Sequence, residues 1–393
     1  MAPRALPLLQ PGRRPRPGQW YRLSPRGERP RGRVGLGCLL LPGRVLLLGG
    51  ADPSGAFADA HFVELGEGRA GPGLEPGPRP GPVPGPIACP PSTAPLRWVP
   101  AGWRGLRPRY EHATFLPATG PPRLWVFGGA QPAGNRSCVQ VLDPEMGTWE
   151  SPAVRGVQPQ PRTFHTSSAA IGARLFVFGG GDKGAEPVKD QRLHVFDTAT
   201  LTWSQPETHG DPPSPRHGHV VVAVGTKLFI HGGLAGDVFY NDLFCIDTND
   251  MRWVKIPATG DIPGGRASHS SAVFQDHLYI FGGIGPDGTL DTTYKYHTGR
   301  QQWTLLQFES PLPSGRLDHA MCVIPWQAGS HGDTGDAPAG TEPPLPAGDK
   351  AEPLQQGPGE GCAEDTFVHL LFVFGGMDTQ GQIHRDCLVT LIE

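Results

Sequence analysis

A pair of adjacent glycines closes a short apolar run six times along this chain. Each run is rich in β-branched and aromatic residues, as in RLFVFGG and HLYIFGG, which is typical of a buried strand. Glycine suits the end of such a strand because it adopts positive φ and lets two backbones approach closely. The pairs are Gly49 and Gly50, Gly128 and Gly129, Gly179 and Gly180, Gly232 and Gly233, Gly282 and Gly283, and Gly375 and Gly376. This recurrence predicts a fold built from copies of one small unit.

Two further markers follow the same period. Four tryptophans, Trp149, Trp203, Trp253 and Trp303, come 20 to 23 residues after a glycine pair. An Arg-x-x-His motif precedes five of the apolar runs, and its central copies are 50 to 54 residues apart. These motifs are Arg109 to His112, Arg162 to His165, Arg216 to His219, Arg266 to His269 and Arg316 to His319. The first repeat departs from the pattern, because Leu36 stands where the histidine would follow Arg33.

A period near 50 with these markers resembles the Kelch repeat, in which one unit forms one propeller blade. The resemblance implies an all-β fold, a six-bladed Kelch β-propeller with four antiparallel strands in each blade. The innermost strand would begin near Arg-x-x-His, and the apolar run would be the second strand. The tryptophan would lie on the outer strand, where a large aromatic ring packs one blade against its neighbour.

The two ends of the chain are predicted to close the ring together. After Gly376 only one strand remains, at about 386–392, and no tryptophan follows it. The segment 19–23 carries Trp20 and would supply the missing outer strand of the last blade. We therefore expect a flexible arm over 1–18 and one propeller over 19–393. The predicted blades are about 33–104, 109–151, 162–205, 216–255, 266–306, and 316–393 together with 19–23.

Two inserts interrupt the period and are too rich in glycine and proline to bury a core. The first, 66–97, lies between the third and fourth strands of blade 1, and the second, 327–365, between the first and second strands of blade 6. Both are predicted to be disordered. In a blade whose strands alternate in direction, these two connections leave by the same face. We expect the opposite face, which carries the loops after the glycine pairs, to be the binding face.

Composition excludes several other classes of protein. The net charge is −3, and no basic cluster lies beyond the N-terminal arm, so nucleic acid is not an expected partner. Seven cysteines without CxxC spacing favour reduced thiols in the cytosol over disulfides or a zinc ribbon. The apolar stretch from Ala5 to Leu9 is too short for a signal peptide, and the run from Leu36 to Leu48 is broken by Pro42 and Gly43. Membrane association would then come only through a partner.

No constellation in the sequence calls for catalysis. The chain has no GxSxG or HExxH motif, and Gly179 to Gly184 lacks the GxxxxGK[ST] pattern of a phosphate loop. The five repeated histidines could in principle bind a metal, but repeat symmetry favours a structural role. The repeated arginines are interpreted as structural bridges between neighbouring blades. We therefore predict no catalytic residues, no cofactor and no metal.

Residues for binding a partner are sought in the loops after the glycine pairs, which vary between blades. Phe239 and Tyr240 are candidate aromatic anchors, although they could instead begin the third strand of blade 4 and be buried. Lys183, Lys189 and Arg136 on neighbouring loops could meet acidic groups of a partner, although solvated surface charge is the default.

Longer stretches resemble a narrower family, the Rab effectors with Kelch motifs. They are Arg107 to Phe115, Thr163 to Gly172, Leu201 to Thr208, Lys227 to Asp237, and the segments YKYHTGRQQWTLL from Tyr294 and GRLDHAMCVIPW from Gly315. The resemblance implies an effector that binds the ninth Rab GTPase in its GTP-bound form. It also implies transport from endosomes to the trans-Golgi network, other endosomal trafficking proteins as partners, and a cytoplasmic, peripheral place on vesicle membranes. The alternatives are a substrate adaptor of a ubiquitin ligase and a metal-dependent Kelch enzyme.

Overall fold

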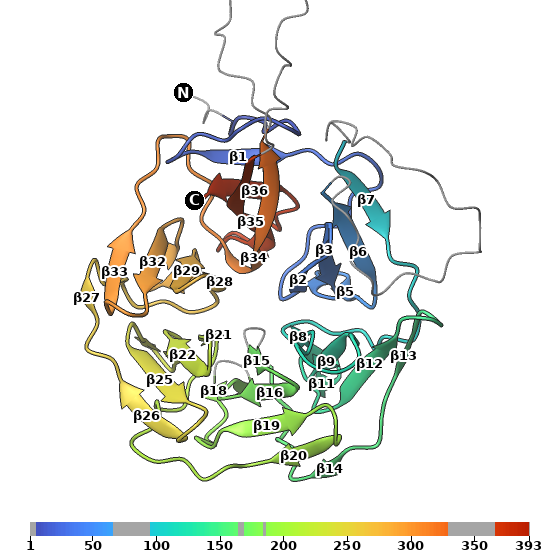
Figure 1. Ribbon diagram of the computed structural model, residues 1–393, viewed down its shortest axis with the longest axis vertical. Helices are drawn as coiled ribbons and strands as arrows, with labels where there is room; N and C mark the ends of the chain where they lie inside the picture. Colours follow the sequence, from blue (N-terminus) through green and yellow to red (C-terminus); the bar gives the residue numbers. More distant parts are fainter. Residues whose placement is uncertain (1–4, 66–94, 164–168, 184–185, 329–365, 393) are drawn as a thin grey trace, which may run out of the picture.

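Six sheets stand around a central axis in the computed structural model, each with four antiparallel strands and two of them with a short fifth strand (Figure 1). The structure describes residues 5–65, 95–163, 169–183, 186–328 and 366–392. This part of the chain contains strands and turns only, so the predicted all-β, six-bladed propeller is confirmed. It also contains no helix that could carry the chain through a bilayer.

The strands of each blade follow chain order from the axis outward, except that β1 is the outermost strand of the last blade. The first three blades consist of β2 (Gly37–Leu41), β3 (Arg44–Leu48), β6 (Ala60–Glu64) and β7 (Arg97–Pro100); β8 (Ala113–Phe115), β9 (Trp125–Phe127), β12 (Val139–Asp143) and β13 (Thr148–Glu150); and β15 (Ala169–Ile171), β16 (Arg174–Val177), β19 (His194–Asp197) and β20 (Thr202–Ser204). Short β14 (Arg155–Gly156) adds to β20 in parallel.

The other three blades repeat this order. They consist of β21 (Val220–Val224), β22 (Lys227–His231), β25 (Leu243–Asp247) and β26 (Arg252–Lys255); β28 (Ser270–Phe274), β29 (His277–Phe281), β32 (Thr293–His297) and β33 (Gln302–Leu305); and β34 (Leu317–Ala328), β35 (Thr366–Met377), β36 (Cys387–Leu391) and β1 (Trp20–Leu23). Short β27 (Thr259–Gly260) adds to β33 in parallel.

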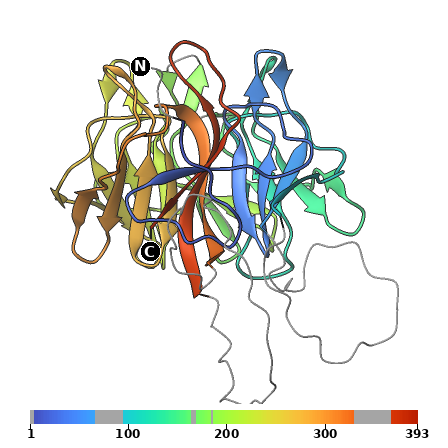
Figure 2. The same ribbon diagram turned by 90° about the horizontal axis from the view of Figure 1, so that it is seen from above.

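A two-stranded hairpin follows the glycine pair in five blades. These hairpins are β4 (Ala51–Asp52) with β5 (Gly55–Ala56), β10 (Ala130–Gln131) with β11 (Gly134–Asn135), β17 (Gly181–Lys183) with β18 (Glu186–Pro187), β23 (Leu234–Ala235) with β24 (Val238–Phe239), and β30 (Ile284–Gly285) with β31 (Gly288–Thr289). They stand on one side of the ring, which we call the hairpin face (Figure 2).

One hydrogen bond joins every blade to the next. The N–H of the second glycine donates to the carbonyl of the repeated arginine in the following blade, as from Gly233 to Arg266 at 2.8 Å. The five other bonds run from Gly50 to Arg109, Gly129 to Arg162, Gly180 to Arg216, Gly283 to Arg316 and Gly376 to Arg33, at 2.8 to 3.1 Å. The ring is thus closed by six equivalent backbone contacts.

The arginine side chains stay within their own blades. Arg216 donates to the carbonyl of Gly232 at 3.0 Å and to Asp242 at 2.6 Å, and all six equivalents are at most 2% exposed. The prediction that these side chains bridge neighbouring blades is therefore corrected, because the arginine main chain makes the bridge. The side chain satisfies the glycine carbonyl, a buried acceptor that would otherwise be costly.

Aromatic rings fill the space between blades. Five of the six outer-strand tryptophans contact the aromatic residue before the glycine pair of the preceding blade, as Trp203 contacts Phe127 at 4.8 Å between ring centroids. The equivalent pairs are Trp20 with Phe281, Trp98 with Phe374, Trp253 with Phe178, and Trp303 with His231. In blade 1 that aromatic position is Leu48, and Trp149 lies instead against Trp103.

The N-terminal strand completes the last blade as predicted. Strand β1 pairs with β36 in antiparallel register, with Trp20 opposite Thr390. Trp20 is fully buried.

Residues 5–18 differ from the flexible arm expected from the sequence. Leu9 is 3% exposed, and its N–H donates to the carbonyl of Arg22 at 3.0 Å. The indole N–H of Trp326 donates to the carbonyl of Arg13 at 2.9 Å. Leu9 of this segment and Trp326 near the end of β34 are part of the same buried apolar cluster, so the arm packs against the propeller.

The predicted inserts begin or end differently in the described residues. Leu96 is 3% exposed and Arg97 begins β7, so the first insert ends sooner than residue 97. Gln327 and Ala328 still pair with β35, so the second begins after residue 328. Pairing of the apolar residues at the end of β34 with those of β35 explains this extension. The segments 66–94 and 329–365 lie outside the described residues. The strand ends that flank them lie opposite the hairpin face, on what we call the insert face.

Substituting the first glycine of a pair should destabilise the ring. In Gly232→Ala the new Cβ would lie 2.7 Å from the carbonyl oxygen of Arg266 in the next blade, at a φ of +70°. Gly236→Ala is a matched control, because its φ is +57° and nothing lies within 4 Å. We expect a loss of about 1 kcal/mol for the control and roughly 3 kcal/mol for Gly232→Ala in denaturant unfolding. Equal losses would contradict a close joint between blades.

Removing the N-terminal strand should destabilise all six blades together. Deletion of residues 1–25 exposes the unpaired edge of β36 and the site of Trp20. We expect a melting temperature lower by at least about 10 °C, since burying one such tryptophan alone stabilises by about 3 to 5 kcal/mol. Arg22→Ala, on the exposed side of the same strand, serves as the control. An unchanged melting temperature in the truncated chain would refute the closure by β1.

Candidate functional site

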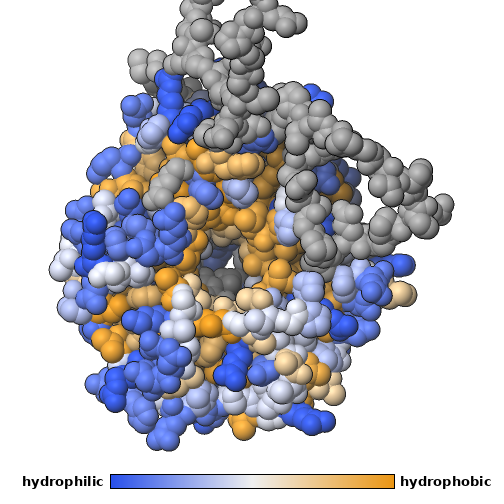
Figure 3. Space-filling model, in the orientation of Figure 1, coloured by the Kyte–Doolittle hydropathy of each residue, from blue (hydrophilic) through white to orange (hydrophobic). Residues whose placement is uncertain are grey.

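The central channel opens on the hairpin face into a funnel of about 580 Å³. Figure 3 views the ring from the opposite, insert face and shows the channel at its centre. The described lining residues are Val34, Ala51, Asp52, Pro53, Gly55, Ala56, Tyr110, Glu111, Pro132, His217, Leu234, Ala267, Ser268, Ile284, Leu317, Asp318 and Met377. This volume is within the usual range for binding pockets of roughly 300 to 1,000 Å³.

A ring of residues in left-handed conformation forms the floor of the funnel. The third residue of each Arg-x-x-His motif, and of the equivalent segment from Arg33 to Leu36, has positive φ where it is described: Gly35 (+59°), Glu111 (+52°), Gly218 (+65°), Ser268 (+54°) and Asp318 (+52°). We call these five residues the channel ring. The equivalent residue of blade 3, Phe164, lies outside the described residues.

Backbone hydrogen bonds run from blade to blade along the channel ring. The N–H of Asp318 donates to Ser268 at 2.9 Å, and that of Gly35 donates to Asp318 at 2.9 Å. Ser268 donates to Gly218 and Glu111 donates to Gly35 in the same way. Left-handed geometry costs a non-glycine residue about 1 to 2 kcal/mol, and these bonds offset that cost. The floor is therefore a backbone annulus that fixes where its side chains point.

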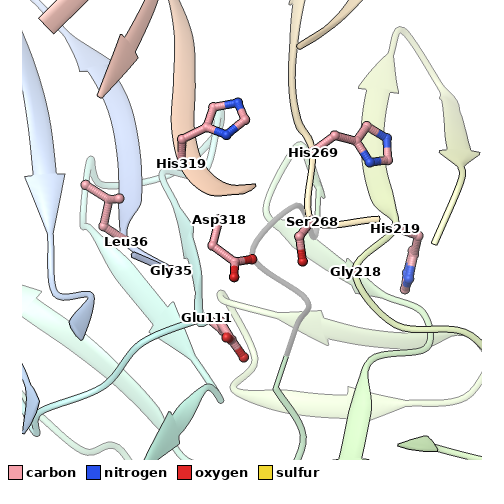
Figure 4. Close-up of a pocket in the computed structure, with 9 residues that line it drawn as sticks. All are labelled: Gly35, Leu36, Glu111, Gly218, His219, Ser268, His269, Asp318 and His319. Carbon is pink, nitrogen blue, oxygen red and sulfur yellow. The ribbon is translucent and has the colours of Figure 1, made fainter. Parts of the chain in front are cut away.

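Two carboxylates and a serine from three blades point toward the channel axis (Figure 4). Glu111 is 6% exposed and accepts a hydrogen bond from the hydroxyl of Thr163. Burial raises the pKa of Asp318 to about 6, although a hydrogen bond from Ser268 opposes the shift. Desolvation of the charged form is the usual reason for such a rise in a carboxyl pKa.

Histidines behind the channel ring stay neutral and hold the blades together. Burial lowers the pKa of His219 and of His319 to about 3, with smaller effects of nearby arginines. The Nε2–H of His219 donates to the carbonyl of Phe178 in the preceding blade at 2.8 Å. At the next junction His231 stands in place of that phenylalanine, and its Nδ1 lies 3.1 Å from Nε2 of His269. The structural interpretation of the repeated histidines accounts for these contacts; His165 lies outside the described residues.

The walls above the floor are mostly apolar. Leu234, Ile284, Leu317 and Met377 contribute side chains from three blades, with alanines and prolines between them. Among the described lining residues the acidic side chains are Asp52, Glu111 and Asp318, and there is no lysine or arginine. The funnel therefore combines apolar walls with an acidic floor.

The five candidate partner-binding residues lie on the hairpin face but outside this funnel. Tyr240 is partly buried, and the guanidinium of Arg216 lies 4.0 Å from its ring centroid, which gives it a packing role. Phe239 is partly buried in β24, ahead of the third strand, which begins at Leu243. Neither residue therefore begins that strand.

The three charged candidates occupy neighbouring hairpins. Lys189 is exposed just after β18. Arg136 is half-buried and donates to Gln131 within its own hairpin. The backbone of Lys183 lies in β17, and its side chain is outside the described set. Gly181 and Asp182, from the glycine-rich segment that lacks the phosphate-loop pattern, lie in β17, and Gly184 is outside the described residues.

One group of side chains in the described residues has the composition of a metal site. Asp276, His277 and His297 lie together at the insert face end of blade 5. However, Nδ1 of His297 accepts the N–H of Gly299 at 3.2 Å, so its proton is on Nε2, the atom that faces Asp276. His297 thereby replaces the aspartate that caps the same turn in the preceding blade, where Asp247 accepts from Asn249. The capping of this turn therefore explains why His297 lies beside Asp276 and His277, without a metal ion.

Sequence reasoning missed the residues that line the funnel. Its acidic floor comes from the variable positions within Arg-x-x-His, which read Tyr-Glu at 110–111, Ala-Ser at 267–268 and Leu-Asp at 317–318. The sequence did contain a signal for these residues, because variation inside an otherwise fixed motif is typical of positions that are not constrained by packing. The convergence of these positions on one axis only becomes visible in the closed ring.

Comparison with known proteins gives consistent matches. The family described as KLHDC2/KLHL20/DRC7 Kelch-repeats domain matches residues 92–283, and the Kelch motif matches residues 265–307. The chain is 73% identical to the Rab9 effector protein with kelch motifs of Gallus gallus over 399 residues, which cover all of both chains. It is 54% identical to the protein of that name in Xenopus laevis and 53% identical to that in Homo sapiens, each over 99% of both chains.

Asp318→Asn should stabilise the fold at neutral pH. The folded carboxyl has a pKa of about 6 against an ordinary value of 3.8, so the folded state holds a proton that the unfolded chain has lost. Stability of the native protein therefore falls as pH rises through this window. We expect the variant to gain roughly 2 kcal/mol at pH 7.5 and almost nothing near pH 4, by denaturant unfolding. Asparagine also tolerates positive φ.

Asp237→Asn is the control for this measurement, because Asp237 is exposed on the hairpin between β23 and β24. We expect the difference in unfolding free energy between the Asp237→Asn variant and the native chain to be the same at both pH values. A gain for Asp318→Asn that is the same at both pH values would show that the carboxyl titrates normally.

Proposed function

The chain belongs to the family of Rab9 effector proteins with kelch motifs, and we propose from this membership that it binds the GTP-bound form of a Rab9 GTPase. The observation that carries the proposal is the 73% identity over the full length of the chicken relative. In this proposal the propeller is a scaffold for protein binding and performs no reaction. Kelch repeats across the chain support a binding role.

Selection of the GTP-bound form follows from the physics of the partner. The γ-phosphate orders the switch segments of a GTPase, and these segments rearrange after hydrolysis. An effector distinguishes the two states only through contacts that differ between them. A closed ring suits this task, because its loops are held by a rigid scaffold and little ordering is needed on binding.

We place the contact surface on the hairpin face. Five hairpins with different sequences stand there on a common frame, and Lys189 projects from one of them. The opposite face is where strands continue into the segments 66–94 and 329–365. The hairpin face thus offers variable side chains on fixed backbone, which favours a specific protein partner.

The proposed cellular role follows from the same partner. Binding a Rab GTPase on its membrane would place the chain on the cytoplasmic side of endosomal and trans-Golgi transport vesicles. Attachment would be peripheral and through the partner. Other endosomal trafficking proteins could then be brought to the same scaffold.

Capture of purified Rab GTPases tests the proposal directly. With this chain as bait, a panel of Rab proteins is loaded either with a GTP analogue or with GDP. We expect selective capture of Rab9 in the GTP-analogue form. Absence of nucleotide-dependent capture of any Rab would overturn the proposal.

Matched lysine variants locate the contact. Lys189→Ala on the hairpin face should weaken capture by a few-fold, as expected for one exposed charge worth up to about 1 kcal/mol. Lys227→Ala is the control, since Lys227 is exposed at the start of β22 on the insert face. Loss of capture with Lys227→Ala alone would move the contact to the insert face.

A further inference from the structure

We propose that the funnel at the mouth of the channel receives a lysine or arginine side chain from an extended segment of a protein partner. The inference goes beyond the proposed function, because it does not depend on which protein supplies the segment. It rests on the shape of the funnel, the chemistry of its walls and the charge of its floor.

The walls match the stem of a long basic side chain. Leu234, Ile284, Leu317 and Met377 present apolar surface between the hairpins and the channel ring. Lysine and arginine carry three or four methylene groups, which pack on apolar surface while the charged head lies beyond them. A small inorganic cation would leave these walls without a partner.

The floor matches the charged head. Glu111 and Asp318 point toward the axis from blades 2 and 6, and Ser268 adds a hydroxyl from blade 5 (Figure 4). A guanidinium presents several N–H donors in a planar fork, and an ammonium presents three. Charge-assisted hydrogen bonds are stronger in a partly buried site, where water screens them less.

Anionic ligands fit the funnel poorly. The described lining residues include no lysine or arginine. The six repeated arginines are turned into their own blades, where Arg316 donates to Gly375 and Asp386 and Arg33 donates to Gly49 and Asp59. A C-terminal carboxylate or a phosphate would therefore be placed beside the carboxylates of Glu111 and Asp318, without a lysine or arginine among the described lining residues to attract it.

A bound metal fits no better than an anion. Among the described residues, no three His, Cys, Asp or Glu ligand atoms converge within 4.8 Å at the floor. One oxygen of Glu111 already accepts the hydroxyl of Thr163. The remaining ligand class that satisfies both walls and floor is an organic cation on an apolar stem.

Methionine methyl resonances provide a direct test. The chain has five methionines, of which Met377 lines the funnel and Met146 is 71% exposed elsewhere. The protein is labelled at the methionine methyl carbons and titrated with acetyl-Ala-Arg-Ala amide. The neutral control is the same peptide with citrulline, which has nearly the same shape without the charge.

We expect a saturable shift of the Met377 signal with the arginine peptide and none with the citrulline peptide, while Met146 stays in place. Asp318→Asn should weaken binding about ten-fold, the equivalent of about 1.4 kcal/mol, with the fold checked by its melting temperature. Asp237→Asn, exposed on the same face, should bind as the native chain does.

The affinity should also fall as the pH drops below about 6, because Asp318 then takes up a proton. Among the described lining residues, the other titratable side chains are Asp52, Tyr110, Glu111 and His217 in the funnel, with His219, His269 and His319 below.

Two results would overturn the inference. One is a Met377 signal that does not move with up to about 20 mM arginine peptide, a concentration that would reveal even weak, millimolar binding. The other is an equal shift with the citrulline peptide, which would show apolar contact without charge recognition. Neither result bears on capture of a GTPase, so the two proposals fail separately.

Discussion

The bond from the second glycine of each pair to the arginine carbonyl of the next blade is the contact on which the rest of the molecule depends. It recurs at all six junctions with lengths of 2.8 to 3.1 Å. The residues immediately after that arginine, such as Leu317 and Asp318, then turn onto the channel axis. The joint between blades therefore also sets the position of the channel ring. A change that loosens one junction would shift a wall of the funnel, so packing and binding share one constraint.

Around this fixed bond the side chains vary within limits. His231 replaces the phenylalanine before a glycine pair and meets both His269 and Trp303, so one aromatic ring serves for another. In blade 1, Leu48 takes that position, and Trp103 supplies the missing aromatic surface to Trp149. The side chain of Arg109 donates to Gln140, and that of Arg266 donates to the hydroxyl of Thr292. The other repeated arginines pair with an aspartate at this position. The backbone bond does not depend on these choices, which explains how the repeats diverge without breaking the ring.

The repeated motifs made the fold predictable from the sequence. Features that occur only once in the chain could not be predicted in this way. The glycine pairs, Trp20 and the single strand after Gly376 together predicted six blades closed by the N-terminal strand. The packing of Leu9 and the carbonyl of Arg13 against the end of β34 was not predicted, because it occurs once and has no period. The funnel was missed for a different reason. Glu111 and Asp318 are 207 positions apart in sequence and line the same cavity only because the ring closes.

The pairing of β1 with β36 has a consequence for folding during synthesis, because the two strands lie at opposite ends of the chain. Trp20 leaves the ribosome near the beginning of translation, while its partner Thr390 is made near the end. At about 5 to 20 residues per second, roughly 20 to 70 seconds separate the two. Throughout that time the last blade lacks an edge and the first-made strand has no sheet to join. Blades can form one after another as they emerge, but the circle becomes complete only when the oldest and youngest parts of the chain meet.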